Sequence, residues 1–277
     1  AMDCYEHGII TPEMADGLEI TWGNTEVMPK LLENIAARKG IGDVLALGVK
    51  GAAAKLGNGA EAYAIHVKGL EGAAHDARSS KMLGLNYGTS TRGMCHIQPL
   101  DGVSYDKGKA DFGLGKFGVP NPEDLDRYDE KGKGTACALL QRGHGLCDIL
   151  SICKFMTYAG LTLEHLAAMM AAITGWDITD AELFEVGERV INLQKMFNVR
   201  EGFGRKDDRL PRRVLSMPVD GPYAENKDCV FHDYESLLDE YYDANGWDHE
   251  GVPYESTLQR LDLLELINAG GGVPARG

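Results

Sequence analysis

The stretch DILSICKF, residues 148–155, places an acid five residues before a cysteine in an otherwise apolar, helix-like run. A buried carboxylate needs a donor partner, and a cysteine reacts or binds metal only as a thiolate. An acceptor and a soft ligand in one segment are typical of a polar ring cofactor beside an iron–sulfur cluster. The alternative is a helix-capping Asp148 and a core Cys153, because free cysteine is among the most buried residue types.

Downstream of residue 135 the pattern predicts a mostly helical chain. Helices are expected near residues 134–159, 162–174, 179–198, 233–245 and 255–268. Thr162 and Thr179 each precede a helix with an acid in its first turn, which is typical of a capped helix start. We expect an irregular loop at residues 106–119 and a frayed tail at residues 270–277.

The first quarter of the chain predicts a mixture of helices and short strands. Asn24 can cap a helix over residues 25–38, and an alanine-rich helix is expected over residues 42–56. Residues 18–22 and 62–68 have the composition of short strands, and we expect them to pair with each other.

Composition excludes several classes of protein. The 277 residues are 44% hydrophobic and 25% charged, which is ordinary for a globular domain. A net charge of -14 opposes binding to nucleic acid or to anionic membranes, because phosphate contacts need a basic face. No apolar run reaches the roughly 18 residues that span a bilayer, and Asp3 and Glu6 stand where a signal peptide is basic. We therefore expect a cytoplasmic protein.

The six cysteines follow no regular spacing, and none forms a C-x-x-C pair. This pattern does not predict a disulfide framework. A self-contained four-iron cluster needs about four thiolates, usually with three of them close in sequence. The chain does not offer that arrangement.

Many short sequence blocks point to one family. They are MDCYEHG (2–8), DGLE (16–19), WGN (22–24), RKGIG (38–42), VKGLE (67–71), HDAR (75–78), TRGMCH (91–96), GERVINL (187–193), FNVREGF (197–203), DRLP (208–211), YY (241–242) and GW (246–247). Together they resemble the aldehyde ferredoxin oxidoreductases, which are tungsten- or molybdenum-pterin enzymes. The resemblance runs through almost the whole chain and corresponds to the C-terminal two thirds of that family.

The resemblance implies a mainly α, two-lobed fragment with a short strand pair near its N-terminus. Residues 1–75 would form the C-terminal part of the family's middle domain, and residues 76–277 would form its C-terminal helical domain. The family's three-cysteine cluster motif, its first pterin-binding Asp motif and its N-terminal sheet domain are not found in the sequence. We expect a fragment or one subunit of a split enzyme, without cofactor and inactive alone.

The resemblance also implies site residues. In the family the pattern D-x-x-G-L-C contacts a pterin and ends in the fourth ligand of a [4Fe–4S] cluster. Here Asp148 matches the acid and Cys153 the cysteine, while Ser151 replaces glycine and Ile152 replaces leucine. Asp148, Ser151, Ile152 and Cys153 would therefore bind cofactor, with Cys153 as the metal ligand. Only glycine adds no side chain at a close backbone approach, so Ser151 is the main departure.

His96 is the candidate catalytic residue. A histidine can transfer a proton near neutral pH, and the resemblance implies that its stretch lies close to the metal. The alternative is a structural histidine bonded to a backbone carbonyl. Glu188 and Asn192 share a helix face and would either support the cofactor or pack helices. Five arginines within residues 200–213 would hold pterin phosphates or, as we favour, serve the structure.

The complete enzyme would oxidise a small aldehyde to a carboxylic acid at a bis-pyranopterin tungsten or molybdenum centre. Electrons would leave through a [4Fe–4S] cluster to ferredoxin. The missing N-terminal region or subunit would be a partner of this chain, and a homodimer is a possible assembly. Two other classes remain open. One is a non-catalytic helical scaffold or partner-binding subunit, and the other is a reductase of an acyl or aromatic substrate on the same fold.

Overall fold

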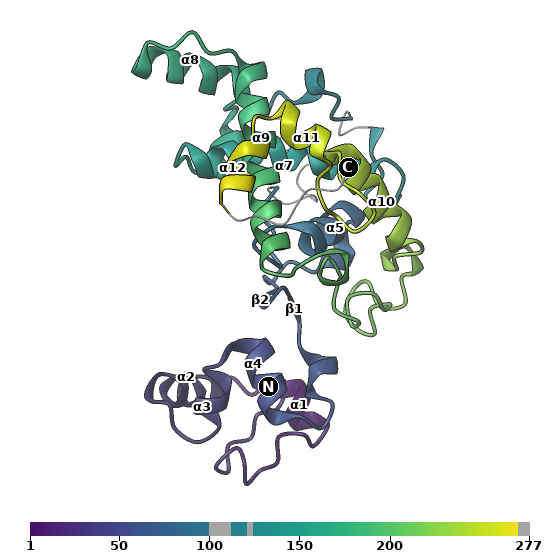
Figure 1. Cartoon of the computed structure of the whole chain (residues 1–277). Helices are drawn as coiled ribbons and strands as arrows, with labels where there is room; N and C mark the ends of the chain where they lie inside the picture. The colour runs from purple at the N-terminus through teal and green to yellow at the C-terminus, as the bar shows by residue number, and fades with distance from the viewer. Residues whose placement is uncertain (100–111, 121–123, 271–277) are drawn as a thin grey trace.

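The computed structural model describes residues 1–99, 112–120 and 124–270, and these form two helical lobes joined by a narrow connection (Figure 1). The helices of the N-terminal lobe are α1 (Met2–Glu6), α2 (Val27–Ala37), α3 (Ile41–Leu45), α4 (Gly48–Leu56) and the 3-10 helix η1 (Ala60–Tyr63). The α-helices of the C-terminal lobe are α5 (Lys81–Thr89), α7 (Lys133–Ile149), α8 (Leu163–Thr174), α9 (Asp180–Arg200), α10 (Tyr234–Asn245), α11 (Glu255–Arg260) and α12 (Leu264–Ala269). Its short 3-10 helices are η2 (Ala77–Ser79), η3 (Gly115–Phe117), η5 (Lys154–Ala159), η6 (Arg205–Asp207) and η7 (Lys227–Cys229).

A two-stranded hairpin lies at the connection between the lobes. Strand β1 (His66–Val67) pairs antiparallel with β2 (Leu70–Glu71), and the turn between them has positive φ at both Lys68 and Gly69. Two positive φ values suit the right-handed twist of a tight hairpin. The Glu71 carboxylate accepts a hydrogen bond from the Val49 backbone N–H at the start of α4, at 2.8 Å. The hairpin is thereby fastened to the N-terminal lobe.

Each lobe has its own cluster of buried hydrophobic side chains. The N-terminal cluster consists of Cys4, Ile10, Ala15, Ile20, Val27, Leu31, Ile41, Ala53 and Ala60. The larger C-terminal cluster surrounds α7, against which α5, α9 and α10 all pack. A Cβ added at Gly187 would lie 2.1 Å from the Arg142 carbonyl oxygen, so the glycine lets α9 approach α7 closely. A third, smaller cluster holds α11 and α12 against Met196 of α9.

The mainly helical fold predicted from the sequence is confirmed. Helices α2, α8, α9 and α10 fall where they were expected. The Thr162 hydroxyl accepts from the His165 backbone N–H, and the Thr179 hydroxyl accepts from that of Glu182, so both predicted caps are confirmed. Of the expected loop at residues 106–119, residues 112–119 are described and contain turns and the short 3-10 helix η3. Residues 106–111 and residues 271–277 of the expected tail lie outside the described residues.

Several details of the prediction are wrong. Residues 18–22 form no strand, and residues 66–67 pair with their own neighbours 70–71 instead. The helix expected over residues 42–56 breaks at Gly48, where φ is +75°, into α3 and α4. The helix expected to reach residue 159 ends at Ile149, and the last predicted helix divides near Asp262, where φ is +54°. Positive φ interrupts a right-handed helix, and only glycine makes such a position visible in a sequence.

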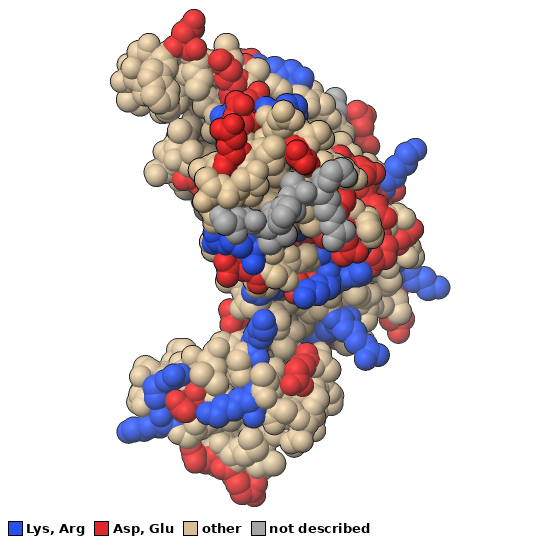
Figure 2. Space-filling model, in the orientation of Figure 1, with Lys and Arg blue, Asp and Glu red and all other residues tan. Residues whose placement is uncertain are grey.

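The surface carries both signs of charge. Figure 2 shows Lys and Arg side chains gathered around the narrow connection, with Asp and Glu side chains spread over the C-terminal lobe. Within the described ranges, no helix has the length and apolar character to cross a membrane.

The domain boundary at residue 75 stays a prediction.

Candidate functional site

A cavity of about 450 Å³ lies in the C-terminal lobe between helix α9, the end of α7 and the segment that follows α5. Its lining combines charged, amide and apolar side chains, which are Thr91, Arg92, Gln98, Asp148, Leu193, Gln194, Phe197 and Asn198. One predicted site residue, Asp148, is among them. The segment 91–98 that forms another wall contains His96.

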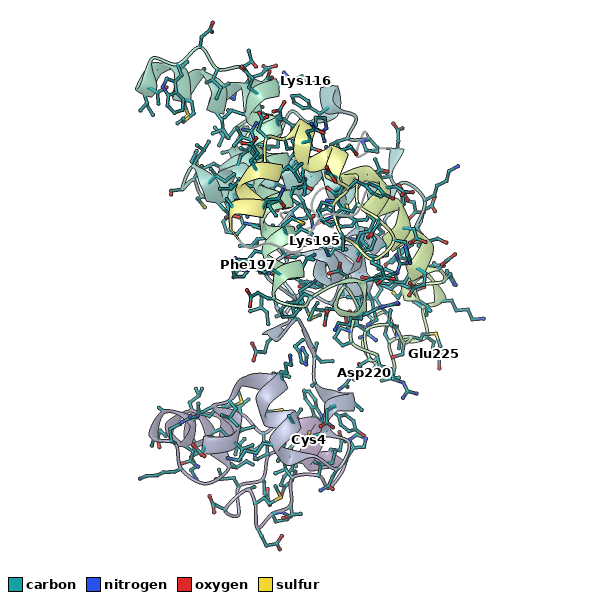
Figure 3. All side chains as sticks on the ribbon, viewed as in Figure 1. Cys4, Lys116, Lys195, Phe197, Asp220 and Glu225 are labelled. Atoms are coloured by element: carbon teal, nitrogen blue, oxygen red, sulfur yellow. The ribbon has the colours of Figure 1, made fainter. Side chains whose placement is uncertain are left out.

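Helix α9 builds one wall from two pairs of residues spaced four apart, which places each pair on one helix face. Gln194 accepts a hydrogen bond from the Thr91 hydroxyl at 2.7 Å, and the Asn198 amide donates to the Thr91 carbonyl at 2.7 Å. These bonds fasten the segment 91–98 to the helix. Leu193 and Phe197 remain exposed although both are large and apolar. Phe197 lies at the edge of the lobe, whereas Lys195 from the same helix points into it (Figure 3).

Asp148 lies in the last turn of α7, and the chain turns back directly after it. The Ile152 backbone N–H donates to the Cys147 carbonyl at 2.8 Å, and η5 then begins at Lys154. The Lys154 ammonium returns to the turn and donates to Asp148 Oδ2 at 2.7 Å. Only 7% of the Lys154 side chain is exposed, against 57% of the Asp148 side chain. The carboxylate is therefore held from behind and open to the cavity.

Ser151 occupies the left-handed region of backbone conformation, with φ at 57°. This conformation costs an ordinary L-residue roughly 1–2 kcal/mol and costs glycine almost nothing. The glycine of the family's pattern thus suits the backbone conformation of this turn, whether or not a cofactor approaches the turn closely. Serine completes the same turn at an energetic cost. The expected cofactor contacts of Ser151 and Ile152 stay predictions; Ile152 packs against the hydrophobic cluster of the lobe.

Cys153 has an exposed side chain at the start of η5, while the other five cysteines are buried. Burial raises the pKa of the neighbouring Cys147 to about 11, against the opposing effect of the Lys154 charge, so that thiol stays protonated near neutral pH. Among the residues that the structure describes, Cys153 is therefore the accessible thiol. It follows the cavity-lining Asp148 by five residues but does not itself line the cavity.

The His96 ring stacks on the ring of His75, with centroids 4.9 Å apart and planes inclined by 27°. It does not line the cavity, although Gln98 two residues later does. Cys95 beside it is buried, and its carbonyl accepts from the Asn86 amide at 2.9 Å. Cys95 is therefore packed inside the lobe, and the catalytic role of His96 stays a prediction.

The remaining candidates join elements of the lobe to each other. Glu188 forms ion pairs with Arg142 at 3.2 Å and with Arg260 at 2.7 Å, which connects α9 to α7 and α11. Asn192 accepts from the Trp247 indole N–H at 2.8 Å. Neither Glu188 nor Asn192 lines the cavity, and these contacts hold elements of the lobe against one another.

The arginines of residues 200–213 also face protein carboxylates. Four of them form ion pairs, namely Arg200 with Glu201, Arg205 with Glu235 and Asp239, Arg209 with Glu235, and Arg213 with Asp3. The last pair connects the two lobes directly. This arrangement favours a structural role for the segment over a role in holding phosphates.

The sequence did not predict the roles of Leu193 and Phe197, which line the cavity, or of Lys154, which lies behind Asp148. Leu193 and Phe197 carried a usable signal, because two large apolar residues four apart stand next to two amides, Gln194 and Asn198, with the same spacing. Lys154 offered only its place directly after Cys153. Its second contact, the Ile97 carbonyl, lies 57 residues away in sequence, and no local pattern reports such a pairing.

Comparisons with known proteins agree with this architecture. The family described as aldehyde ferredoxin oxidoreductase, domains 2 and 3, matches residues 1–263. The chain is 34% identical to a tungsten-containing aldehyde ferredoxin oxidoreductase of Thermococcus kodakarensis and 35% identical to one of Pyrococcus abyssi. Each match covers 96% of this chain and 42% of the relative, so the chain spans less than half the length of these relatives.

A solved structure has a similar fold. It is the active-site complex BamBC of benzoyl-coenzyme A reductase with 1,5-dienoyl-CoA, at 26% identity and a TM-score of 0.69. The match covers 97% of this chain and 44% of that chain. The same arrangement of helices therefore occurs in a protein named for a different substrate.

Proposed function

The chain belongs to the aldehyde ferredoxin oxidoreductase family, and from this premise we propose that it forms the pterin-binding and electron-exit side of an aldehyde-oxidising enzyme. The observation that carries the proposal is the open carboxylate of Asp148, in a cavity lined by both polar and apolar side chains, five residues before the accessible thiol of Cys153. The rest of the active site would come from sequence that the relatives have beyond the matched region.

The cavity has the chemistry that a pterin ring requires. The Asp148 carboxylate only accepts hydrogen bonds, the Arg92 guanidinium only donates them, and the Gln98 amide does both. Leu193 and Phe197 add an apolar wall against which a flat ring can lie. The volume of about 450 Å³ falls within the roughly 300–1,000 Å³ of small-molecule sites. The residues present therefore fit the group that the family implies.

Each side chain has a separate task in this proposal. Asp148 would accept hydrogen bonds from pterin N–H groups, and the Cys153 thiolate would be the one cluster ligand that this chain contributes. When bound, the tungsten or molybdenum centre supplies the two-electron oxidation of the aldehyde. A ring nitrogen of His96 would hold or release a proton near that centre, which requires it to turn from His75 or to act through it. Electrons would pass to ferredoxin.

The test is a cysteine series in the full-length protein, purified without oxygen. The wild-type protein should contain iron together with tungsten or molybdenum, and it should oxidise aldehydes with an artificial electron acceptor. Cys153→Ala should lose most of the iron and the paramagnetic signal of the reduced cluster, because a thiolate ligand is removed. The matched controls Cys137→Ala and Cys229→Ala remove buried thiols and should keep both. Full iron content in Cys153→Ala would refute the ligand assignment.

The likeness to benzoyl-coenzyme A reductase supports a second candidate, a reductase of an acyl or aromatic substrate on the same fold. Both candidates would bind the same pterin cofactor and iron–sulfur cluster, so the metal and iron counts do not separate them. A substrate screen does: turnover of aldehydes supports the first candidate, and turnover of aromatic acyl thioesters in place of aldehydes supports the second. A full-length protein without metal would favour the non-catalytic scaffold.

A further inference from the structure

We infer that Lys154 is the positioning residue of the cofactor cavity: its ammonium group holds the Asp148 carboxylate and fixes the segment 91–98 to the same turn. The inference deepens the proposed function and rests on it for the nature of the ligand. Lys154 lies next to Cys153 in sequence, yet it turns inward while Cys153 stays exposed. The residue thus connects three parts of the candidate site.

The geometry of the bridge is specific. Lys154 Nζ donates to the Ile97 carbonyl at 2.6 Å and to Asp148 Oδ2 at 2.7 Å. Ile97 lies between His96 and the cavity-lining Gln98, so the bond fixes the backbone from which both side chains project. An ammonium group has three donors and no acceptor, which suits a bridge between a carbonyl and a carboxylate. An uncharged side chain of the same length could fill the space but could not make these bonds.

The charge of Lys154 acts in a shielded environment. The side chain is almost fully buried, and its charge adds to the effect of burial in lowering the pKa of His144 to about 3. Asp148, by contrast, has a mostly exposed side chain. A buried cation behind an open anion fixes the direction of the carboxylate while leaving it able to accept from a ligand. A freely rotating carboxylate would lose conformational entropy on binding, and Lys154 reduces that loss.

Removal of Lys154 should disturb both partners together. In Lys154→Met the Ile97 carbonyl and the Asp148 carboxylate both lose their charge-assisted donor, so neither is held in place. We expect pterin and metal content to fall about tenfold or more under fixed purification conditions, which corresponds to about 1.4 kcal/mol. Lys154→Arg keeps the charge and should retain most of the content. Lys116→Met is the matched control, because Lys116 also bridges two partners, Glu164 and Asp180, away from the cavity.

A double-variant cycle separates positioning from mere support of the fold. If Lys154 acts through Asp148, the loss in Lys154→Met/Asp148→Asn should be smaller than the product of the two single losses. Hydrogen exchange on the cofactor-free protein gives a readout independent of activity. Lys154→Met should raise exchange both in residues 90–98 and in residues 147–156, whereas Lys116→Met should leave both unchanged.

Each outcome has one meaning. Losses that multiply in the double variant would overturn the inference, and so would unchanged exchange in residues 90–98. A wild-type protein without metal and pterin would refute the proposed function, while the exchange experiment would still decide whether Lys154 makes the bridge. If Lys154→Met does not fold, Lys154→Gln replaces it in both measurements. The glutamine side chain is shorter than that of lysine, and its amide carries no charge.

Discussion

The C-terminal lobe contains two lysine–aspartate pairs with the same N–O distance of 2.7 Å and opposite surroundings. Lys154 meets Asp148 at the cavity, and Lys195 meets Asp208 inside the lobe. The exposed fraction of the carboxylate side chain is 57% in the first pair and 1% in the second. Asp208 also receives Lys68 at 2.6 Å and the Tyr242 hydroxyl at 2.5 Å.

The difference teaches what each pair can do. A buried carboxylate must have its lone pairs satisfied by the protein, because desolvation of an unpaired charge is costly. Asp208 meets this condition with two ammonium groups and a hydroxyl, which fixes the hairpin, α9 and α10 to one another. Asp148 has one protein cation and an open side. The first arrangement stabilises the fold, and the second leaves capacity for a ligand.

The largest effect is expected for Asp208→Asn. The variant leaves Lys68 and Lys195 buried without their carboxylate, and loss of one partner in a buried ion pair costs about 3–5 kcal/mol. Urea unfolding of the full-length protein, or of this chain if it folds alone, measures the change. Asp148→Asn is the comparison variant and should lower the unfolding free energy by no more than about 1 kcal/mol, because its carboxylate is solvated. Equal losses in the two variants would remove the distinction between the pairs.

The pH dependence gives a second measure of the buried pair. Burial would raise the pKa of Asp208, but the charges of Lys195 and Lys68 outweigh it and hold the pKa below its usual value. A depressed folded-state pKa means that the carboxylate contributes fully above the unfolded-state pKa of about 3.9 and loses its contribution as the pH falls through the folded value. The stability gap between wild type and Asp208→Asn should therefore narrow below about pH 4.

The next effect concerns His96, the candidate catalytic residue in the segment 91–98 beside the open pair. His96→Asn in the full-length protein should keep metal and iron while lowering aldehyde turnover by roughly 10²-fold, the usual contribution of a positioned acid or base. Steady-state rates and metal counts on the same sample measure it. His249→Asn, on an exposed histidine outside the cavity lining, serves as the control. Loss of metal together with activity would make His96 a support of the cofactor instead.

A smaller effect is expected for cofactor retention in Asp148→Asn. The amide keeps the shape of the carboxylate but turns one acceptor into a donor, which would face the N–H groups of a pterin. Charge-assisted hydrogen bonds are worth roughly 1.5–3 kcal/mol, so pterin and metal content should fall about tenfold or more. Unchanged content and activity would reduce Asp148 to the helix-end residue of the alternative interpretation.

The smallest effect is expected for Tyr242→Phe, which removes the hydroxyl from Asp208 and leaves both lysines. A hydrogen bond to a charged group contributes about 1.5–3 kcal/mol to stability, and we expect the lower end because both lysines still hold Asp208. Thermal or urea unfolding measures the difference, with Tyr254→Phe on a partly exposed tyrosine as the control. A loss as large as that of Asp208→Asn would show that the hydroxyl, and not the cations, holds the buried carboxylate.

The sequence predicted those parts of the fold that carry a local signal. Helices α8 and α9 begin with threonine caps and were placed correctly. Helix α5 was missed because all nine of its residues are buried, so it has no polar face and no helical periodicity to read. The break between α11 and α12 has positive φ at Asp262, and no glycine at that position announces it in the sequence.

The candidate site was predictable only in part. Asp148 and Cys153 could be named because the resemblance supplied a pattern to match, and no comparison tests their roles further. The cavity depends on contacts between residues 91–98 and 194–198, about one hundred positions apart. Lys154 depends on a contact of the same kind. Such pairings follow from how α5, α7 and α9 pack, and local patterns do not encode them.

The hairpin between the lobes has a mechanical consequence. Lys68 is anchored among Asp208 and the carbonyls of Gly88 and Ser90 in one lobe, while Glu71 is anchored to the first turn of α4 in the other. Three residues of chain span at most about 10 Å, so the two anchor points cannot move far apart. The hairpin therefore acts as a tether of fixed length: a force that separates the lobes must break the Lys68 or the Glu71 anchor, as well as the ion pair between Arg213 and Asp3.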